Sequence, residues 1–200
     1  MIFNVPGIGT IILLVLFPDT YIFSRILNNN KMTLNYPKAG KTEKTIEVLN
    51  DLLKINNDRI AGYQKALEQS TNIDISLREE FKKIISESII YRQQLIQEIG
   101  QNNGDAKTGT TIFGKIYRAW MDLKVAFAGN TQKTILSSCL YNEEIALHVY
   151  KAALNVNADL SKEIREMIEE QEDALRKAHI QIKNYREARH IMDLSLLYFN

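Results

Sequence analysis

The sequence predicts an all-α protein, a bundle of four long helices with a long crossover that carries an extra short helix. Apolar residues recur at helical spacing in long stretches after residue 40. Nine Gly and only three Pro in 200 residues leave these stretches uninterrupted. No alternating strand pattern of convincing length appears there. Two short turns and one long connection separate the four stretches, which is typical of helix bundles.

The first predicted helix spans residues 42–69 and carries two apolar stripes. The main stripe consists of Ile46, Leu49, Leu53, Asn56, Ile60, Tyr63 and Leu67. The second consists of Val48, Ile55, Gly62 and Ala66. A helix with two apolar stripes needs two packing partners.

The second predicted helix follows the turn STNID, in which Asp74 or Ser76 can act as the N-cap. The helix runs to residue 99, and Gly100 is placed to end it as a C-terminal cap. Its stripe consists of Leu77, Phe81, Ile84, Ser88, Tyr91, Leu95 and Ile99.

The crossover begins with the polar stretch QNNGDAKTGT and continues into an aromatic-rich segment, TIFGKIYRAWMDLKVAFAG. This segment is predicted to be a short helix with Phe113, Ile116, Tyr117, Trp120 and Phe127 on one side. We expect it to cover the second stripe of the first helix, where Gly62 and Ala66 allow a close approach.

The third predicted helix follows Gly129-Asn130-Thr131 and runs to residue 155. Its stripe consists of Ile135, Cys139, Asn142, Glu143, Ala146, Val149, Tyr150 and Ala153. The fourth helix opens at Ala158-Asp159 and contains no breaker, so we expect it to reach residue 190 or beyond and to overhang its partners. Its stripe consists of Leu160, Ile164, Met167, Ile168, Gln171, Leu175, Ala178, Ile182 and Tyr185.

The chain thus divides into an apolar N-terminal segment (1–40), the bundle (41–190) and an apolar C-terminal tail (191–200). The tail either extends the fourth helix, packs on the N-terminal segment or makes a subunit contact. The bundle is expected to form a homo-oligomer through its overhanging helix and apolar ends.

Residues 7–23 are strongly apolar and have three interpretations: a start-site artefact with Met32 as the native start, a membrane anchor, or a signal segment. No Lys or Arg precedes them, no small-residue cleavage site follows, and Pro18-Asp19 interrupts them. The uninterrupted run 8–17 is too short to span a bilayer as a helix. We expect membrane attachment or export only if residues 7–23 are a real anchor or signal.

Charge and cysteine content narrow the class of protein further. The net charge of +1 is too small to attract nucleic acid electrostatically. Lys and Arg are also expected on solvated faces, so no nucleic-acid partner is predicted. The single cysteine, Cys139, cannot form an internal disulfide and is expected to be a buried structural thiol. A reducing cytoplasm is the simplest compartment.

Each long helix carries a polar residue within its apolar stripe, near the middle of the helix. These residues are Asn56, Ser88, Glu143 and Gln171. We expect them to form one polar layer across the bundle, with Tyr63 and Tyr150 supplying hydroxyl groups. An unpaired buried polar group costs about 1–3 kcal/mol, so the layer should be hydrogen-bonded internally. The neighbouring Asn57 and Asp58 are expected to face the rim or solvent.

Helix bundles can hold a di-iron site at such a layer, built from a Glu on each of two helices and an ExxH pair on each of the other two. No ExxH pair occurs in the sequence. Glu143 is the one acid in the layer, and Glu87 flanks it. The favoured interpretation is a hydrogen-bonded network that fixes helix register and needs no cofactor. The alternatives are an iron or manganese site using Glu143 and Glu87, or a site for another small ligand.

Three blocks together resemble a bacterial family of ferritin-like four-helix bundles described as a domain of unknown function. They are LNDLLKINNDRIAGYQKAL, GKIYRAWMDLKVAFAG and ILSSCLYNEEIALHVYKAAL, and the resemblance covers roughly residues 42–187. It implies the ferritin-like fold, a bacterial source and a distant relation to bacterial ferritins and rubrerythrins. It brings no activity, and a link to stress responses is only an expectation.

The first helix also resembles bacterial ferritins, in which the motif LNxLLxxEL carries a metal-binding glutamate. The corresponding stretch, LNDLLKIN, places Asn56 where that glutamate would be. Glu143 is similar in position to the third-helix glutamate, whereas the ExxH positions do not match. The resemblance therefore does not transfer iron oxidation or storage to this chain.

Three functional hypotheses follow from the sequence. The first is a non-catalytic bundle that acts through protein contacts, and the sequence favours it because the ligand set is depleted. The second is a degenerate metal enzyme or iron-handling protein that uses Glu143. The third is a membrane-associated bundle tethered by residues 7–23.

Overall fold

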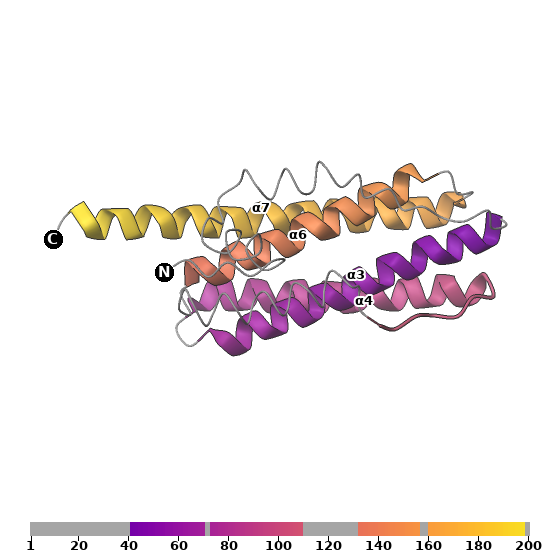
Figure 1. Ribbon diagram of the computed structural model, residues 1–200, viewed down its shortest axis with the longest axis horizontal. Helices are drawn as coiled ribbons and strands as arrows, with labels where there is room; N and C mark the ends of the chain where they lie inside the picture. Colours follow the sequence, from indigo (N-terminus) through magenta and orange to yellow (C-terminus); the bar gives the residue numbers. More distant parts are fainter. Residues whose placement is uncertain (1–40, 71–72, 110–131, 157–159, 199–200) are drawn as a thin grey trace, which may run out of the picture. The chain divides into compact units, whose positions relative to one another are not determined.

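A computed structural model describes residues 41–70, 73–109, 132–156 and 160–198, without the side chains of 41, 69, 190 and 193–198. These residues belong to one compact unit, residues 36–200. They form four helices and no strand: α3 (Lys41–Gln69), α4 (Ile75–Gln101), α6 (Gln132–Asn155) and α7 (Lys162–Tyr198) (Figure 1). The predicted all-α four-helix bundle is confirmed. The short helix expected within the crossover lies outside the described residues.

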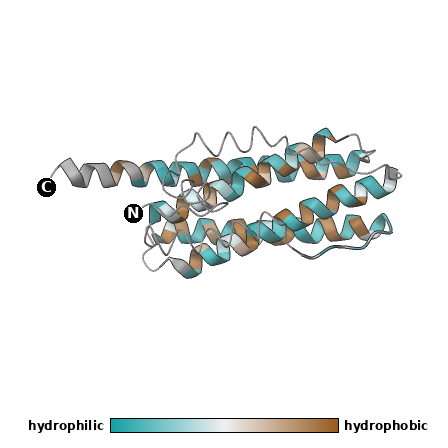
Figure 2. Ribbon diagram, viewed as in Figure 1, coloured by the Kyte–Doolittle hydropathy of each residue, from teal (hydrophilic) through white to brown (hydrophobic). Residues whose placement is uncertain are grey.

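The four helices pack as two hairpins. Helix α3 packs most closely on α4 and α6 on α7, and the two hairpins meet mainly through α3 and α6. Helices α4 and α7 make the fewest contacts of these pairs. Each helix presents hydrophobic residues at helical spacing along the ribbon, as Figure 2 shows.

The contacts at the helix ends fix the directions of the helices. The start of α4 lies beside the start of α6, because the side-chain amide of Gln132 donates to Asp74 Oδ2 over 2.9 Å. The end of α4 lies beside the start of α3, where Gly104 approaches Ile46. Helix α4 is therefore antiparallel to α3 and parallel to α6. The chain between Gln101 and Gln132 must return from one end of the bundle to the other.

The first residues of this return, 102–109, run along α3. The Asn50 side chain accepts from the Lys107 backbone N–H at 2.6 Å and donates to the Asp105 carbonyl at 3.1 Å. Two turns further along α3, Asn57 donates to the carbonyls of Thr108 and Gly109, each at 3.0 Å. Asn57 therefore holds the crossover to α3, where the sequence had suggested a rim or solvent position.

Helix α4 ends in a left-handed C-cap, three residues later than the glycine signal indicates. Gly100 lies inside the helix, Asn102 is the C-cap residue, and Asn103 has φ 58°. The Gly104 N–H donates to the Ile99 carbonyl and the Asn103 N–H to the Gly100 carbonyl, as in a Schellman motif. The expectation of Gly100 as the cap is wrong because Asn also tolerates the left-handed region.

Helix α7 begins later than the sequence indicates, and its end beyond residue 190 agrees with the expectation. The Ser161 hydroxyl accepts from the Ile164 N–H at 3.2 Å, which makes Ser161 the N-cap in place of Ala158-Asp159. The helix continues without interruption to Tyr198, so the first eight residues of the predicted tail extend it. Among its described side chains, Ile182 is the last that is buried.

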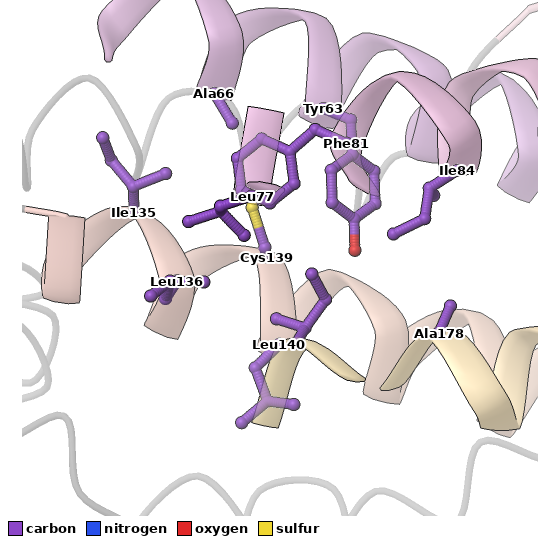
Figure 3. Packing of buried hydrophobic residues seen from close by; sticks show 11 residues of the cluster. Tyr63, Ala66, Leu77, Phe81, Ile84, Ile135, Leu136, Cys139, Leu140 and Ala178 are labelled. Atoms are coloured by element: carbon purple, nitrogen blue, oxygen red, sulfur yellow. The ribbon is translucent and has the colours of Figure 1, made fainter. Parts of the chain in front are cut away.

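An apolar cluster joins all four helices on one side of the polar layer. Figure 3 shows residues from α3, α4, α6 and α7 in this cluster, with the Tyr63 hydroxyl directed toward the α6–α7 hairpin. The Tyr63 and Phe81 rings meet edge to face, with centroids 5.1 Å apart. Cys139 is a free, buried thiol in the same cluster.

The second apolar stripe of α3, Val48, Ile55, Gly62 and Ala66, is buried, and so is the main stripe except for the half-buried Ile46 and Leu67. The expected cover of that stripe, the short crossover helix, lies outside the described residues. In the described part of the chain, no helix is long and apolar enough to cross a membrane. Residues 7–23 lie outside that part.

Candidate functional site

The centre of the bundle holds an ion pair between α3 and α6. The Arg59 guanidinium donates from Nε to Glu143 Oε1 and from a terminal nitrogen to Oε2, both at 3.0 Å. The two side chains are 1% and 0% exposed. This two-pronged geometry is the strongest that an arginine and a carboxylate can form, and it occupies both carboxylate oxygens.

The other terminal nitrogen of Arg59 connects the ion pair to α4. It donates to the Ser88 hydroxyl at 2.9 Å, and this hydroxyl in turn donates to the Ile84 carbonyl at 2.7 Å. Ser88 is completely buried. The ion pair thus joins three helices through charge-assisted and neutral hydrogen bonds.

A second set of hydrogen bonds lies one turn away along α3. The Asn56 amide donates to the Tyr150 hydroxyl at 2.7 Å, and this hydroxyl donates to Gln171 Oε1 at 2.7 Å. The Gln171 amide then donates to Gln94 Oε1 at 2.8 Å, on the exposed side of α4. This chain of hydrogen bonds crosses all four helices and ends at the surface between α4 and α7.

Two buried polar atoms in this region have no hydrogen-bond partner in the described structure: Asn56 Oδ1 and the Tyr63 hydroxyl. The Tyr63 hydroxyl lies near Glu143, whose negative charge raises the pKa of this phenol, but it makes no hydrogen bond within the described structure. The Arg59–Glu143 pair is thus fully hydrogen-bonded, whereas these two polar atoms of the layer are not.

The electrostatics keep the centre charged and its phenols neutral. Burial acts to lower the pKa of Arg59, but attraction and hydrogen bonds from Glu143 outweigh burial and raise it. Burial raises the pKa of Tyr63 well above its usual range, and the Glu143 charge adds to this. Burial also raises the pKa of Tyr150 and of the Cys139 thiol.

The structure brings most of the sequence-predicted layer together. Asn56, Tyr150 and Gln171 form one hydrogen-bonded set, and Ser88 and Glu143 share Arg59 as a partner. Glu87 is outside this set: it is partly exposed and lies 4.0 Å from Lys83 Nζ on the same helix.

Sequence reasoning missed Arg59, Gln94 and the burial of Asp58. Arg59 was expected on a solvated face and Asp58 at the rim or in solvent, but they are 1% and 2% exposed. The available signal for Arg59 was its position three residues after Asn56, together with a lone buried acid, Glu143, that required a counter-charge.

The negative charge of Glu143 is neutralised by the Arg59 guanidinium. The guanidinium occupies the position that a metal ion would take at a metal-binding carboxylate. Among the residues that the structure describes, no group of three or more His, Cys, Asp or Glu side chains could hold a metal ion. The described geometry gives both carboxylate oxygens of Glu143 a guanidinium partner, Arg59.

Comparison with known proteins identifies one family. Residues 44–156 match a domain of unknown function, DUF2383. The match begins in α3 and ends just after α6, so it includes the ion pair and leaves out α7. No curated protein matches the chain significantly.

Proposed function

We propose that this chain, which belongs to the DUF2383 family, is a non-catalytic scaffold that acts through protein contacts. The family is described as a domain of unknown function, so it assigns no activity of its own. The carrying observation is the buried pair of Arg59 and Glu143. A metal at Glu143 would have to displace Arg59 and leave a guanidinium unpaired in the core. Breaking a buried pair in this way costs about 3–5 kcal/mol, which opposes metal binding.

The proposal includes a ferritin-like relationship. Two observations support it: the directions of the four helices, with a return of the chain between the second and third, and the position of Asn56 in a stretch similar to a ferritin glutamate motif. In this interpretation an ion pair and a hydrogen-bonded chain replace the ancestral metal ligands. A bacterial source, a cytoplasmic location and an association with stress responses belong to the same proposal.

The proposed contacts include one between copies of this chain. Ile180 and Ile191 are 49% and 66% exposed on α7. They are eleven positions apart, about three helical turns, so they lie on the same face of the helix. Exposed apolar side chains on one helix face are a common basis for self-association.

The non-catalytic part of the proposal is tested by metal loading. The full chain is incubated aerobically with ferrous iron, and separately with manganese, then desalted and analysed for metal. We expect no stoichiometric metal in the wild type. Stoichiometric metal that is lost in the Glu143→Gln variant would overturn the proposal.

The contact part is tested by light scattering over a range of concentrations. We expect the wild type to form a homo-oligomer. Ile180→Lys and Ile191→Lys should weaken it, so that these variants are dissociated at protein concentrations at which the wild type is still associated. Ile75→Lys is the matched control, because Ile75 is 81% exposed at the start of α4. A strict monomer in the wild type would exclude self-association, whatever the metal result.

A further inference from the structure

We propose that the dipeptide Asn103-Gly104, at the end of α4, is a site of spontaneous deamidation that the folded C-cap holds back. The product of the reaction does not fit the cap, so the modification releases the start of the crossover from α3. The site is thus a one-way switch in the chain. The proposal does not depend on the proposed function, because it concerns the chemistry of the backbone at this cap.

Asn103 is the only asparagine in the chain that is followed by glycine. In such a pair the backbone nitrogen of the glycine can attack the carbonyl carbon of the asparagine side chain. Glycine permits this attack best because it has no β-carbon to hinder the approach. The Asn103 side chain is also exposed, whereas the amide of its neighbour Asn102 donates to the Glu98 carbonyl at 2.8 Å. Sequence and exposure together therefore single out Asn103.

The reaction needs water and no other reagent. The Gly104 nitrogen loses its proton to water or hydroxide and forms a bond to Asn103 Cγ, while the bond from Cγ to Nδ2 breaks. The Nδ2 group takes a proton from water and leaves as ammonia, and a succinimide ring remains. Water then opens the ring at one of its two carbonyl carbons. Opening at the side-chain carbon gives aspartate, and opening at the backbone carbon gives isoaspartate.

The C-cap of α4 withholds the attacking nitrogen. The Gly104 N–H donates to the Ile99 carbonyl at 2.9 Å, and the Asn103 N–H donates to the Gly100 carbonyl at 3.0 Å. The first bond holds the proton that the reaction must remove. Both bonds maintain the left-handed conformation of Asn103, which has φ 58°. Attack therefore requires the cap to open, so the rate in the folded protein follows the fraction of molecules in which it is open.

Contacts with α3 keep the cap closed. A β-carbon added at Gly104 would lie 2.7 Å from Ile46 Cγ2, so the backbone packs directly against this side chain. The Asn50 side chain holds the next turn of the chain, through the Asp105 carbonyl and the Lys107 N–H. Opening of the cap is therefore coupled to release of this segment from α3.

The reaction product disrupts the same cap. Isoaspartate routes the backbone through the side-chain carbon and lengthens it before Gly104, so the two cap hydrogen bonds cannot both form. Either product also places a carboxylate at the C-terminal end of α4, where the helix dipole is itself negative. Both changes favour the released crossover, and the lost ammonia makes the change irreversible.

Peptide mapping by mass spectrometry follows the reaction in the full-length protein at mildly alkaline pH. Conversion of amide to acid at Asn103 is measured over time in buffer and in concentrated urea at the same pH, and isoaspartyl methyltransferase labels the isoaspartate. We expect the folded protein to react about tenfold or more slowly than the unfolded chain, because opening the cap breaks two backbone hydrogen bonds. Equal rates in the two states, or no conversion at Asn103 in urea, would overturn the proposal.

Two variants test the coupling to α3. Asn50→Ala removes the side chain that holds Asp105 and Lys107, and Ile46→Ala removes the side chain against which Gly104 packs. Each should raise the rate of conversion at Asn103 several-fold in the folded protein. Asn155→Ala is the matched control, because it removes an asparagine that donates to a backbone carbonyl at the end of α6.

Far-UV circular dichroism establishes which of these variants keep their helices, and only folded variants are compared. Faster conversion in Asn50→Ala or Ile46→Ala, with the wild-type rate in Asn155→Ala, supports the coupling. A rate that stays at the wild-type value in every folded variant would show that the contacts with α3 do not guard the cap, which contradicts the proposal.

Limited trypsin digestion measures the release of the crossover. Lys107 lies in the segment that Asn50 holds, so cleavage after Lys107 requires this segment to leave α3. In protein aged until part of it is converted, molecules with isoaspartate at position 103 should be cut after Lys107 several-fold faster than unconverted molecules. Equal cleavage of the two populations would show that the modification does not release the crossover, and the switch would have to be abandoned.

Discussion

The guanidinium of Arg59 supplies the charge that makes a buried Glu143 tolerable. The sequence pattern predicts the polar residue in each of the four stripes, because each interrupts an apolar repeat. It does not predict the direction of Arg59, because an arginine at the edge of a stripe can also extend its charge to solvent. The deciding partner, Glu143, lies on another helix 84 residues away.

The two buried tyrosines of the layer provide a matched comparison at the residue scale. Tyr150 accepts from Asn56 and donates to Gln171, whereas the Tyr63 hydroxyl has no hydrogen-bond partner in the described structure. Tyr150→Phe should therefore lower the free energy of unfolding by about 1–3 kcal/mol, because it removes the partner of one Asn56 amide N–H and of Gln171 Oε1. Tyr63→Phe should change it by less than about 1 kcal/mol. Urea unfolding measures both, and equal losses would contradict the traced hydrogen bonds.

At the element scale, the sequence predicts the helices better than their ends. The long helical repeats require apolar burial over many turns, so α3, α4, α6 and α7 all occur where the periodicity places them. The position of a helix end depends on a single capping residue, and several neighbouring residues could take that role. Asn103 takes the left-handed position that Gly100 seemed to offer, and Ser161 caps α7 in place of Asp159.

The roles of the polar residues on the outer face of α3 were the least predictable from the sequence. A polar residue off an apolar stripe normally faces water, which is why Asn57 and Asp58 were expected at the rim. Helix α3 is instead in contact with the returning chain, and Asn50 and Asn57 both donate to its backbone carbonyls. Such roles depend on the path of the crossover, which local periodicity does not encode.

At the scale of the whole molecule, the two sets of hydrogen bonds hold the two hairpins in register. The ion pair joins α3 to α6, and the Tyr150–Gln171 bond extends the connection to α7. A shift of one hairpin past the other would leave several buried polar groups unpaired. The layer therefore favours one alignment of the apolar surfaces, which on their own would tolerate several.

The buried phenols and thiol predict a loss of stability at alkaline pH. Unfolded, Cys139 and the tyrosines ionise near their ordinary pKa values of 9.0 and 10.0, whereas burial raises those pKa values in the folded state. Above these values the folded state binds more protons than the unfolded state, so stability falls as pH rises. The contribution is complete below about pH 9 and decreases above it.

Urea unfolding from pH 7 to 11 measures this decline, together with the phenolate absorbance of the folded protein. Tyr63→Phe should make the decline shallower, because one group that must stay protonated is removed. A stability that is constant or rises over this range would show that these side chains are not buried as described.

The most direct test of the central claim is a double-mutant cycle on Arg59 and Glu143, followed by urea unfolding. Arg59→Met and Glu143→Met should each lower the free energy of unfolding by about 3–5 kcal/mol, because each leaves one buried charge unpaired. The double variant should lose less than either single variant, because no charge then remains in the core. Additive losses, with the double variant the least stable, would show that the two side chains are not partners and would contradict the account.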